Sequence, residues 1–280
     1  MANNIYTCIW CNNNASAMAA FYTGIFSEAK IVDENPMVTV VEVEGQNLML
    51  LNGGNIFRPN PSVSFMVLCS SAEEVEGLYN QLVKDGKPLM ELGKYPWSDK
   101  YGWVEDQYGV SWQLYLGDSG NALQKLVPTL MFTGVNNGKA KEAIEFYTHL
   151  FPNSKITGIM EYTGNEGEQA GNVQNAQFDI NGFTLMCMDS GHNHQFNFTE
   201  GISFVVNCKN QAEIDHYWEA HTAGGGKESM CGWLKDPYGL SWQIVPENIG
   251  ELMQSQGARD ALMQMKKIII ADLEAANKNN

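Results

Sequence analysis

The sequence has 280 residues, with 17 Lys and Arg against 32 Asp and Glu, and therefore a formal net charge of −15. Hydrophobic residues make up 44% and charged residues 18%, a balance that excludes general disorder. Because so acidic a chain repels polyanions, we expect neither nucleic acid nor an anionic membrane as a partner. Residues 1–20 contain no Lys or Arg and no unbroken apolar run. We therefore expect a cytoplasmic protein with no signal peptide and no membrane span.

The first part of the chain predicts a strand, an amphipathic helix and three more strands. An alternating run at 5–11 is typical of a strand, and Met18, Tyr22, Ile25 and Phe26 recur at helical spacing after it. Further strands are predicted near 30–33, 37–44 and 47–52. Together these elements form a βαβββ module.

The same order recurs further along the chain. A strand at 63–69 precedes Ser71-Ala-Glu-Glu74, a capping box that opens a helix, and later strands are predicted at 102–105 and 110–116. The second half repeats the scheme, with strands at 129–133, 173–180, 183–188 and 202–208 and helices around Ile144 and Tyr217. The chain is therefore predicted to contain four βαβββ modules, two in each domain.

The turn-rich segment 117–121 marks a domain boundary. We predict a first domain over 1–118, a linker over 119–127, a second domain over 128–247 and a helical tail over 248–280. Six cysteines lie at 8, 11, 69, 187, 208 and 231 without regular spacing, and reduced thiols are expected. Cys8 and Cys11 form a C-x-x-C pattern, but in a strand they point to opposite faces, which disfavours a shared metal or disulfide.

The two halves are copies of each other. The segments 102–113 and 232–243 agree at eight of twelve positions in the pattern Gly-Trp-x-x-Asp-x-Tyr-Gly-x-Ser-Trp-Gln, at an offset of 130 residues. Phe21-Tyr22 and Phe146-Tyr147 match at an offset of 125. A nearly constant offset indicates a tandem duplication.

Paired βαβββ modules, a helix ending in Phe-Tyr-x-x-x-Phe and the closing tryptophan motif resemble the PhnB-like branch of the vicinal oxygen chelate superfamily. That branch is also labelled 3-demethylubiquinone-9 3-methyltransferase-like. The superfamily includes glyoxalases, extradiol dioxygenases, fosfomycin-resistance transferases and bleomycin-resistance proteins. The resemblance implies an α+β fold of tandem glyoxalase-like domains, in which two modules form a curved mixed sheet around a cavity. In the enzymes, His, Gln and Glu side chains hold one divalent metal there.

The resemblance places neutral side chains at the metal-ligand positions. The first-strand position falls on Thr7 and Thr129, the opening strand of the second module offers Ser64 and Ser203, and the closing glutamate is replaced by Gln113 and Gln243. Hydroxyls and amides are poor substitutes for imidazole and carboxylate, so no metal site is predicted. We expect Thr7, Ser64 and Gln113 to line one cavity, and their counterparts the other.

Three further residues are cavity candidates. Trp103 and Trp233 are read either as aromatic cavity walls or as core anchors. Asp189 ends a strand near another expected ligand position, beside the loop His192-x-His194. Asp106 and Asp236 are expected to hold a turn, and catalytic residues stay undetermined.

The favoured hypothesis is a protein that binds a small molecule in a cavity with a degenerate metal site. One alternative is a metal-dependent lyase, isomerase, dioxygenase or transferase, in which Asp189 or the histidine loop helps recruit a divalent ion. Another is a structural protein whose cavity is filled by its own side chains. Methyl transfer is not supported, because no Gly-rich nucleotide-binding turn follows a strand. The duplication predicts internal domain pairing and leaves a further homodimer open.

Overall fold

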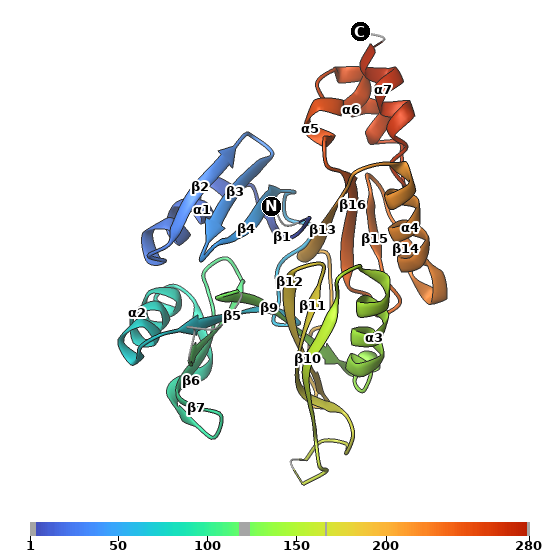
Figure 1. Cartoon of the computed structure of the whole chain (residues 1–280). Helices are drawn as coiled ribbons and strands as arrows, with labels where there is room; N and C mark the ends of the chain where they lie inside the picture. Colours follow the sequence, from blue (N-terminus) through green and yellow to red (C-terminus); the bar gives the residue numbers. More distant parts are fainter. Residues whose placement is uncertain (1–3, 118–123, 166, 279–280) are drawn as a thin grey trace. The chain divides into compact units, whose positions relative to one another are not determined.

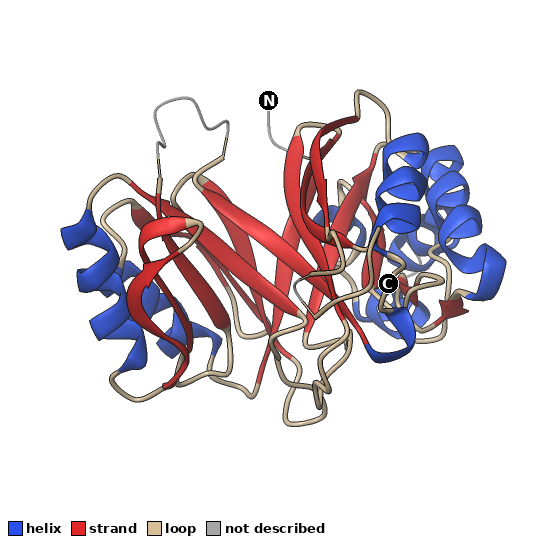
Figure 2. Ribbon diagram, turned by 90° about the horizontal axis from the view of Figure 1, so that it is seen from below, coloured by secondary structure: helices blue, strands red, loops and turns tan. Residues whose placement is uncertain are grey.

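The computed structural model describes residues 4–117, 124–165 and 167–278 (Figure 1). The α+β class and the four βαβββ modules predicted from the sequence are confirmed. Two compact units are present, Met1–Tyr6 with Ser203–Asn280 and Thr7–Ile202. Figure 2 shows that the helices lie beside the strands rather than among them.

Two modules come from the first copy. The first contains β1 (Ile5–Cys11), α1 (Ala15–Ile25), β2 (Ala29–Glu34), β3 (Val38–Val43) and β4 (Gln46–Asn52). The second contains β5 (Val63–Cys69), α2 (Ala72–Val83), β6 (Lys87–Tyr95), β7 (Ser98–Glu105) and β8 (Ser111–Leu116). Strand β6 was not anticipated, because its sequence lacks regular alternation of polar and apolar residues.

The second copy repeats this order. Its first module contains β9 (Leu126–Thr133), the 3-10 helix η1 (Gly134–Asn136), α3 (Ala140–Leu150), β10 (Lys155–Glu161), β11 (Val173–Ile180) and β12 (Phe183–Ser190). Its second contains β13 (Ile202–Cys208), α4 (Gln211–Thr222), η2 (Ala223–Gly225), β14 (Lys227–Glu228), β15 (Trp233–Lys235) and β16 (Ser241–Pro246). Three short helices follow, α5 (Ile249–Leu252), α6 (Gln256–Leu262) and α7 (Ile270–Lys278).

One mixed sheet lies wholly within the unit Thr7–Ile202 and joins modules from both copies. Its strand order is β10-β11-β12-β9-β5-β8-β7-β6. At its centre β5 runs antiparallel to β9, with Ser64 opposite Thr129, and each of these strands pairs on its other side with a parallel strand, β8 or β12. The sheet therefore combines the second module of copy one with the first module of copy two.

The remaining strands form two sets of four. In one set β1 lies next to β4 in parallel register, with Thr7 opposite Leu48, and β3 and β2 continue antiparallel. In the unit that contains residues 203–280, β13 pairs in parallel with β16, and β15 and β14 follow. The modules thus share one internal topology.

The helices begin where their sequences provide caps. The Ser71 hydroxyl accepts a hydrogen bond from the Glu74 amide at 3.2 Å, as the predicted capping box requires, and the Glu74 carboxylate accepts one at 2.8 Å from the amide of Ser70, the residue before the cap. In copy two Asn210 and Glu213 make the equivalent bonds, with Glu213 bound to the Lys209 amide. Both pairs fix the strand-to-helix turn at the start of the second module.

The predicted linker, 119–127, falls mainly on residues 118–123, which lie outside the described ranges. Its last residues, Leu126 and Val127, already belong to β9. Among the helices of the described ranges, none is long and apolar enough to cross a membrane.

Candidate functional site

The tryptophan motif is built around a buried carboxylate. The Asp106 carboxylate accepts hydrogen bonds from the Tyr108 and Val110 amides at 2.8 and 3.0 Å, from the Tyr22 hydroxyl at 2.8 Å and from the Trp112 indole at 2.9 Å. Burial raises its pKa, against the lowering effect of these donors. Asp106 therefore holds the β7–β8 turn and joins it to α1, which is the structural role expected for it.

Copy two makes the same turn with Asp236. Its carboxylate accepts from the Tyr238 and Leu240 amides at 2.9 and 3.0 Å and from the Trp242 indole at 2.9 Å. Three motif positions are thus explained by this turn: the Asp and the second Trp by their hydrogen bonds, and the Gly by its positive φ, 86° at Gly109 and 84° at Gly239. They position the last strand of each copy, on which Gln113 and Gln243 lie.

Gln113 is held by hydrogen bonds at both ends of its amide. The Tyr101 hydroxyl donates to Gln113 Oε1 at 2.7 Å, and Gln113 Nε2 donates to Ser64 Oγ at 2.8 Å. Burial raises the pKa of Tyr101, so its hydroxyl keeps its proton and remains a donor. This chain across β7, β8 and β5 fixes the orientation of the amide, and all three side chains are buried.

The surroundings of this chain are apolar and uncharged. Thr129 lies opposite Ser64 in the β5–β9 ladder and Met186 opposite Thr129 in the β9–β12 ladder, which places all three on one face of the sheet. Met66, Tyr101 and Val127 form a buried cluster, against which partly buried side chains pack: Leu68, Met90, Tyr95, Trp103, Tyr115 and Met186. We call this surface the Gln113 face.

Trp103 belongs to this face and Asp189 does not. Trp103 lies opposite Gln113 in the β7–β8 ladder, and its indole donates to Ser111 Oγ at 2.6 Å. Asp189 is opposite Phe132, three residues after Met186 on β12, and because side chains alternate along a strand it points to the other face of the sheet. There its carboxylate accepts from the amides of Gly138, Ala140 and Val173 at 2.8, 3.2 and 2.9 Å, which fixes the start of α3.

Copy two places Ser203 and Gln243 together in the other unit. Gln243 Nε2 donates to Ser203 Oγ at 3.0 Å, and Trp233 lies opposite Gln243 in the β15–β16 ladder. The position of Tyr101 is taken by Cys231, whose thiol instead contacts the Leu262 carbonyl at 3.5 Å. The amide of Gln243 therefore lacks the tyrosine donor that Gln113 has.

The expected grouping of Thr7 with Ser64 and Gln113 is not formed. Thr7 is buried on β1 opposite Leu48, in a different set of strands, and Thr129 takes its place beside Ser64. The prediction missed Tyr101, although strand alternation already placed it on the side of β7 that carries Trp103. Tyr101 lies just before the repeated segment 102–113, and the matching residue in copy two is Cys231, so the repeat did not mark it.

The residues of the Gln113 face do not fit the divalent metal implied by the resemblance. The donors are a serine and a threonine hydroxyl, a thioether and an amide oxygen that already accepts from Tyr101. Within the described ranges, no group of three His, Cys, Asp or Glu side chains lies close enough to hold an ion. In the histidine loop, His194 Nε2 lies 2.9 Å from Ser190 Oγ, and His192 lies 3.8 Å from Glu168.

The fold is that of glyoxalase I. The structure of glyoxalase I from Zea mays superposes with a TM-score of 0.59 at 13% identity, covering 88% of this chain and 93% of that one. A point mutant of the same Zea mays protein gives 0.57 at 12% identity, over 89% and 95% of the two chains. The tandem glyoxalase-like architecture predicted from the sequence is therefore confirmed.

The family follows from a sequence match. The family described as 3-demethylubiquinone-9 3-methyltransferase matches residues 3–115 and 124–245, and the chain belongs to this family, whose PhnB-like character the sequence predicted. A PhnB protein from Bacillus cereus is 32% identical over 40% of this chain and 98% of its own, with a TM-score of 0.38. No curated protein matches the chain significantly.

Proposed function

We propose that the Gln113 face binds an uncharged, flat small molecule and that it does so without a metal ion. The observation that carries the proposal is the hydrogen-bonded amide of Gln113, whose two ends are satisfied by Tyr101 and Ser64. An amide locked in this way is a fixed structural dipole and not an open ligand for a cation.

The composition of the face supports an apolar ligand. Trp103, Tyr115 and Met186 are partly exposed beside the buried cluster, and aromatic and thioether surfaces adapt to flat rings. The polar groups beneath them are neutral, so a charged ligand would lose hydration without gaining a counter-charge. These features are typical of small-molecule sites, which combine apolar walls with a few oriented polar groups.

The test compares two matched substitutions with N-phenyl-1-naphthylamine, an uncharged two-ring fluorescent probe. Met186→Glu introduces a carboxylate into the Gln113 face and should weaken probe binding by about tenfold or more. Met37→Glu makes the same change at an exposed position between β2 and β3, outside the sheet that carries the Gln113 face, and should leave binding unchanged. No saturable binding to the unmodified protein, or equal affinity of both variants, would contradict the proposal. Absence of saturable binding to the unmodified protein would favour a structural protein whose cavity is filled by its own side chains.

A further inference from the structure

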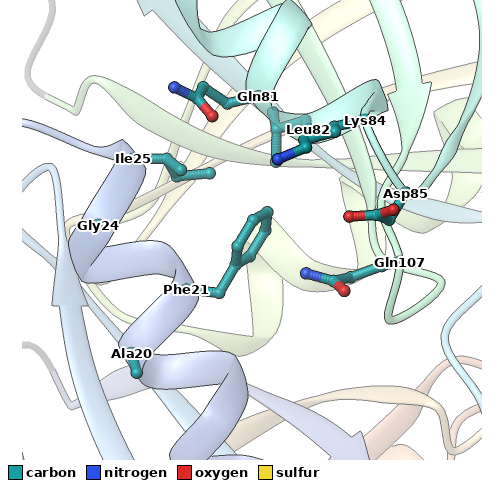
Figure 3. A pocket seen from close by; sticks show the side chains of 9 residues that line it. All are labelled: Ala20, Phe21, Gly24, Ile25, Gln81, Leu82, Lys84, Asp85 and Gln107. Carbon is teal, nitrogen blue, oxygen red and sulfur yellow. The ribbon is translucent and has the colours of Figure 1, made fainter.

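A cavity lies away from the Gln113 face, within the unit Thr7–Ile202. It has a volume of about 480 Å³ and is bordered by the end of β1, the start of α1, residues 57–59, the α2–β6 turn and the β7–β8 turn. Such a volume is in the range that holds small ligands. A neighbouring cavity of about 310 Å³, beside Phe21, shares Asp85 and Gln107 with it, and Figure 3 shows both side chains directed into that space.

The cavity has aromatic walls whose positions are fixed by packing. The Trp10 indole donates to the Gly54 carbonyl at 2.8 Å, and its ring meets Phe57 edge-on at 5.0 Å. A Cβ at Gly53 would lie 2.1 Å from the Trp10 ring, so only glycine allows this approach. Tyr108 provides a third ring from the β7–β8 turn. The walls are therefore preformed for a flat group.

The backbone that presents Arg58 is equally constrained. A Cβ at Gly201 would lie 2.0 Å from the Arg58 carbonyl oxygen, and the Gly201 carbonyl accepts from the Trp10 amide at 3.0 Å. Asn60 donates to the Asn197 carbonyl at 3.0 Å. The segment that carries Arg58 is thus anchored on both sides by residues 197–201.

Only some of the charged side chains that line the cavity have partners within the protein. Lys87 and Glu105 form an ion pair at 2.9 Å, and Asp106 already receives four hydrogen bonds. Within the described ranges, neither Arg58 nor Asp85 forms an ion pair. Among the described residues, one positive and one negative side chain of the cavity lining therefore have no ion-pair partner.

We propose that this cavity binds a zwitterionic small molecule with a flat ring, an aromatic α-amino acid or a close analogue. Its carboxylate pairs with Arg58, its ammonium group pairs with Asp85 at the junction of the two cavities, and its ring packs against Trp10 and Phe57. Arginine suits a carboxylate because its planar group donates two parallel hydrogen bonds. The site is independent of the Gln113 face.

Calorimetry with three indole ligands tests the proposal. L-tryptophan carries both charges, N-acetyl-L-tryptophan only the carboxylate and tryptamine only the ammonium group. L-tryptophan should bind saturably and at least about threefold more tightly than either analogue, since an ion pair with a solvent-exposed side chain contributes about that factor. If L-tryptophan does not bind saturably, or if an analogue with one charge binds as tightly, the proposal fails.

Two substitutions test which side chain pairs with each charged group of the ligand. Arg58→Gln should weaken L-tryptophan and N-acetyl-L-tryptophan binding and leave tryptamine unchanged, and Asp85→Asn should weaken L-tryptophan and tryptamine only. Lys209→Gln and Asp33→Asn, which make the same changes of charge at exposed positions elsewhere, should leave all three affinities unchanged. Met186→Glu should also bind L-tryptophan normally, and a loss of binding there would place the ligand on the Gln113 face and overturn the proposal.

Discussion

At the scale of single residues, the Asp106 carboxylate determines how the β7–β8 turn is held. Its Oδ2 atom accepts from both the Tyr22 hydroxyl and the Trp112 indole, and its Oδ1 atom accepts from two backbone amides. An asparagine in its place would present its NH2 group to two of these donors, either the two amides or the Tyr22 hydroxyl and the Trp112 indole. Because only the Tyr22 hydroxyl can turn and accept a hydrogen bond, at least one buried donor would lose its acceptor.

We therefore expect Asp106→Asn to lower the free energy of unfolding by about 2–3 kcal/mol, the cost of an unsatisfied buried donor to a charged group. Urea unfolding measures this change. Glu105→Gln, one residue earlier and in a partly exposed ion pair with Lys87, should cost less than about 1 kcal/mol. Equal losses for the two variants would show that Asp106 is not the anchor of the turn.

His221 gives the protein a specific sensitivity to acid. It is fully buried, its ring stacks on Trp242 with centroids 4.5 Å apart, and burial lowers its pKa to about 3. Below the unfolded pKa of about 6.5, the unfolded chain binds a proton that the folded chain does not. His221 therefore lowers the free energy of unfolding progressively as the pH falls from about 6.5 toward 3.

His221→Phe keeps a ring on Trp242 and removes the titration. We compare the free energy of unfolding of this variant with that of the unmodified protein. As the pH falls from 7.5 to 5, the difference should shift by about 2 kcal/mol in favour of the variant, at about 1.4 kcal/mol per pH unit below 6.5. Urea unfolding at both pH values gives the comparison. A difference that does not change with pH would contradict this role of His221.

At the scale of elements, Lys125 connects three segments of the unit Thr7–Ile202. Its ammonium group lies 2.9 Å from Glu44, in the β3–β4 turn, and 2.9 Å from Glu74, in the first turn of α2. The Glu44 side chain is 2% exposed, whereas that of Lys125 is 27% exposed. Without Lys125, the buried Glu44 would lack its counter-charge.

Lys125→Met should therefore lower the free energy of unfolding by about 1–3 kcal/mol, less than for a fully buried pair because Lys125 is partly solvated. The double variant Lys125→Met/Glu44→Gln should recover much of this loss, since it removes the uncompensated charge. Thermal or urea unfolding of the single and double variants decides the matter. If the second substitution adds its own loss instead, the Lys125–Glu44 pair is not coupled as described.

The elements that the sequence predicted best were those with regular periodicity. Apolar residues at helical spacing placed the four helices α1 to α4 correctly. The sequence pattern likewise placed the strands β5, β8 and β13. Strand β6 has three register shifts against β7, and strands β14 and β15 are only two and three residues long, so periodicity could not reveal them. The capping boxes marked helix starts because they depend only on local hydrogen bonds.

At the scale of the whole molecule, the sequence revealed the duplication but not which modules share a sheet. The pairing of β5 with β9 joins the two copies, and it depends on long-range strand order rather than local pattern. The expected association of Thr7 with Ser64 failed for this reason, and Thr129 fills the position. Ser64 and Gln113 were predicted together correctly, because both lie within one module.

The two copies also differ from each other at one position of the site, despite the duplication. Gln113 and Gln243 both donate to a serine, but only Gln113 has a tyrosine donor, since Cys231 replaces Tyr101 in copy two. The two halves are therefore alike in fold and unlike in site chemistry. We expect the apolar probe to bind with a stoichiometry of one per chain, which fluorescence titration at protein concentrations far above Kd would measure.

The central claim, that the Gln113 face binds an apolar molecule without a metal, is tested by titrating N-phenyl-1-naphthylamine into the protein with EDTA, and then with added zinc or manganese. The neutral donors at Ser64, Thr129 and Gln113 predict one affinity in all conditions, within about twofold. Loss of probe binding in EDTA, with recovery on addition of a divalent ion, would contradict the account.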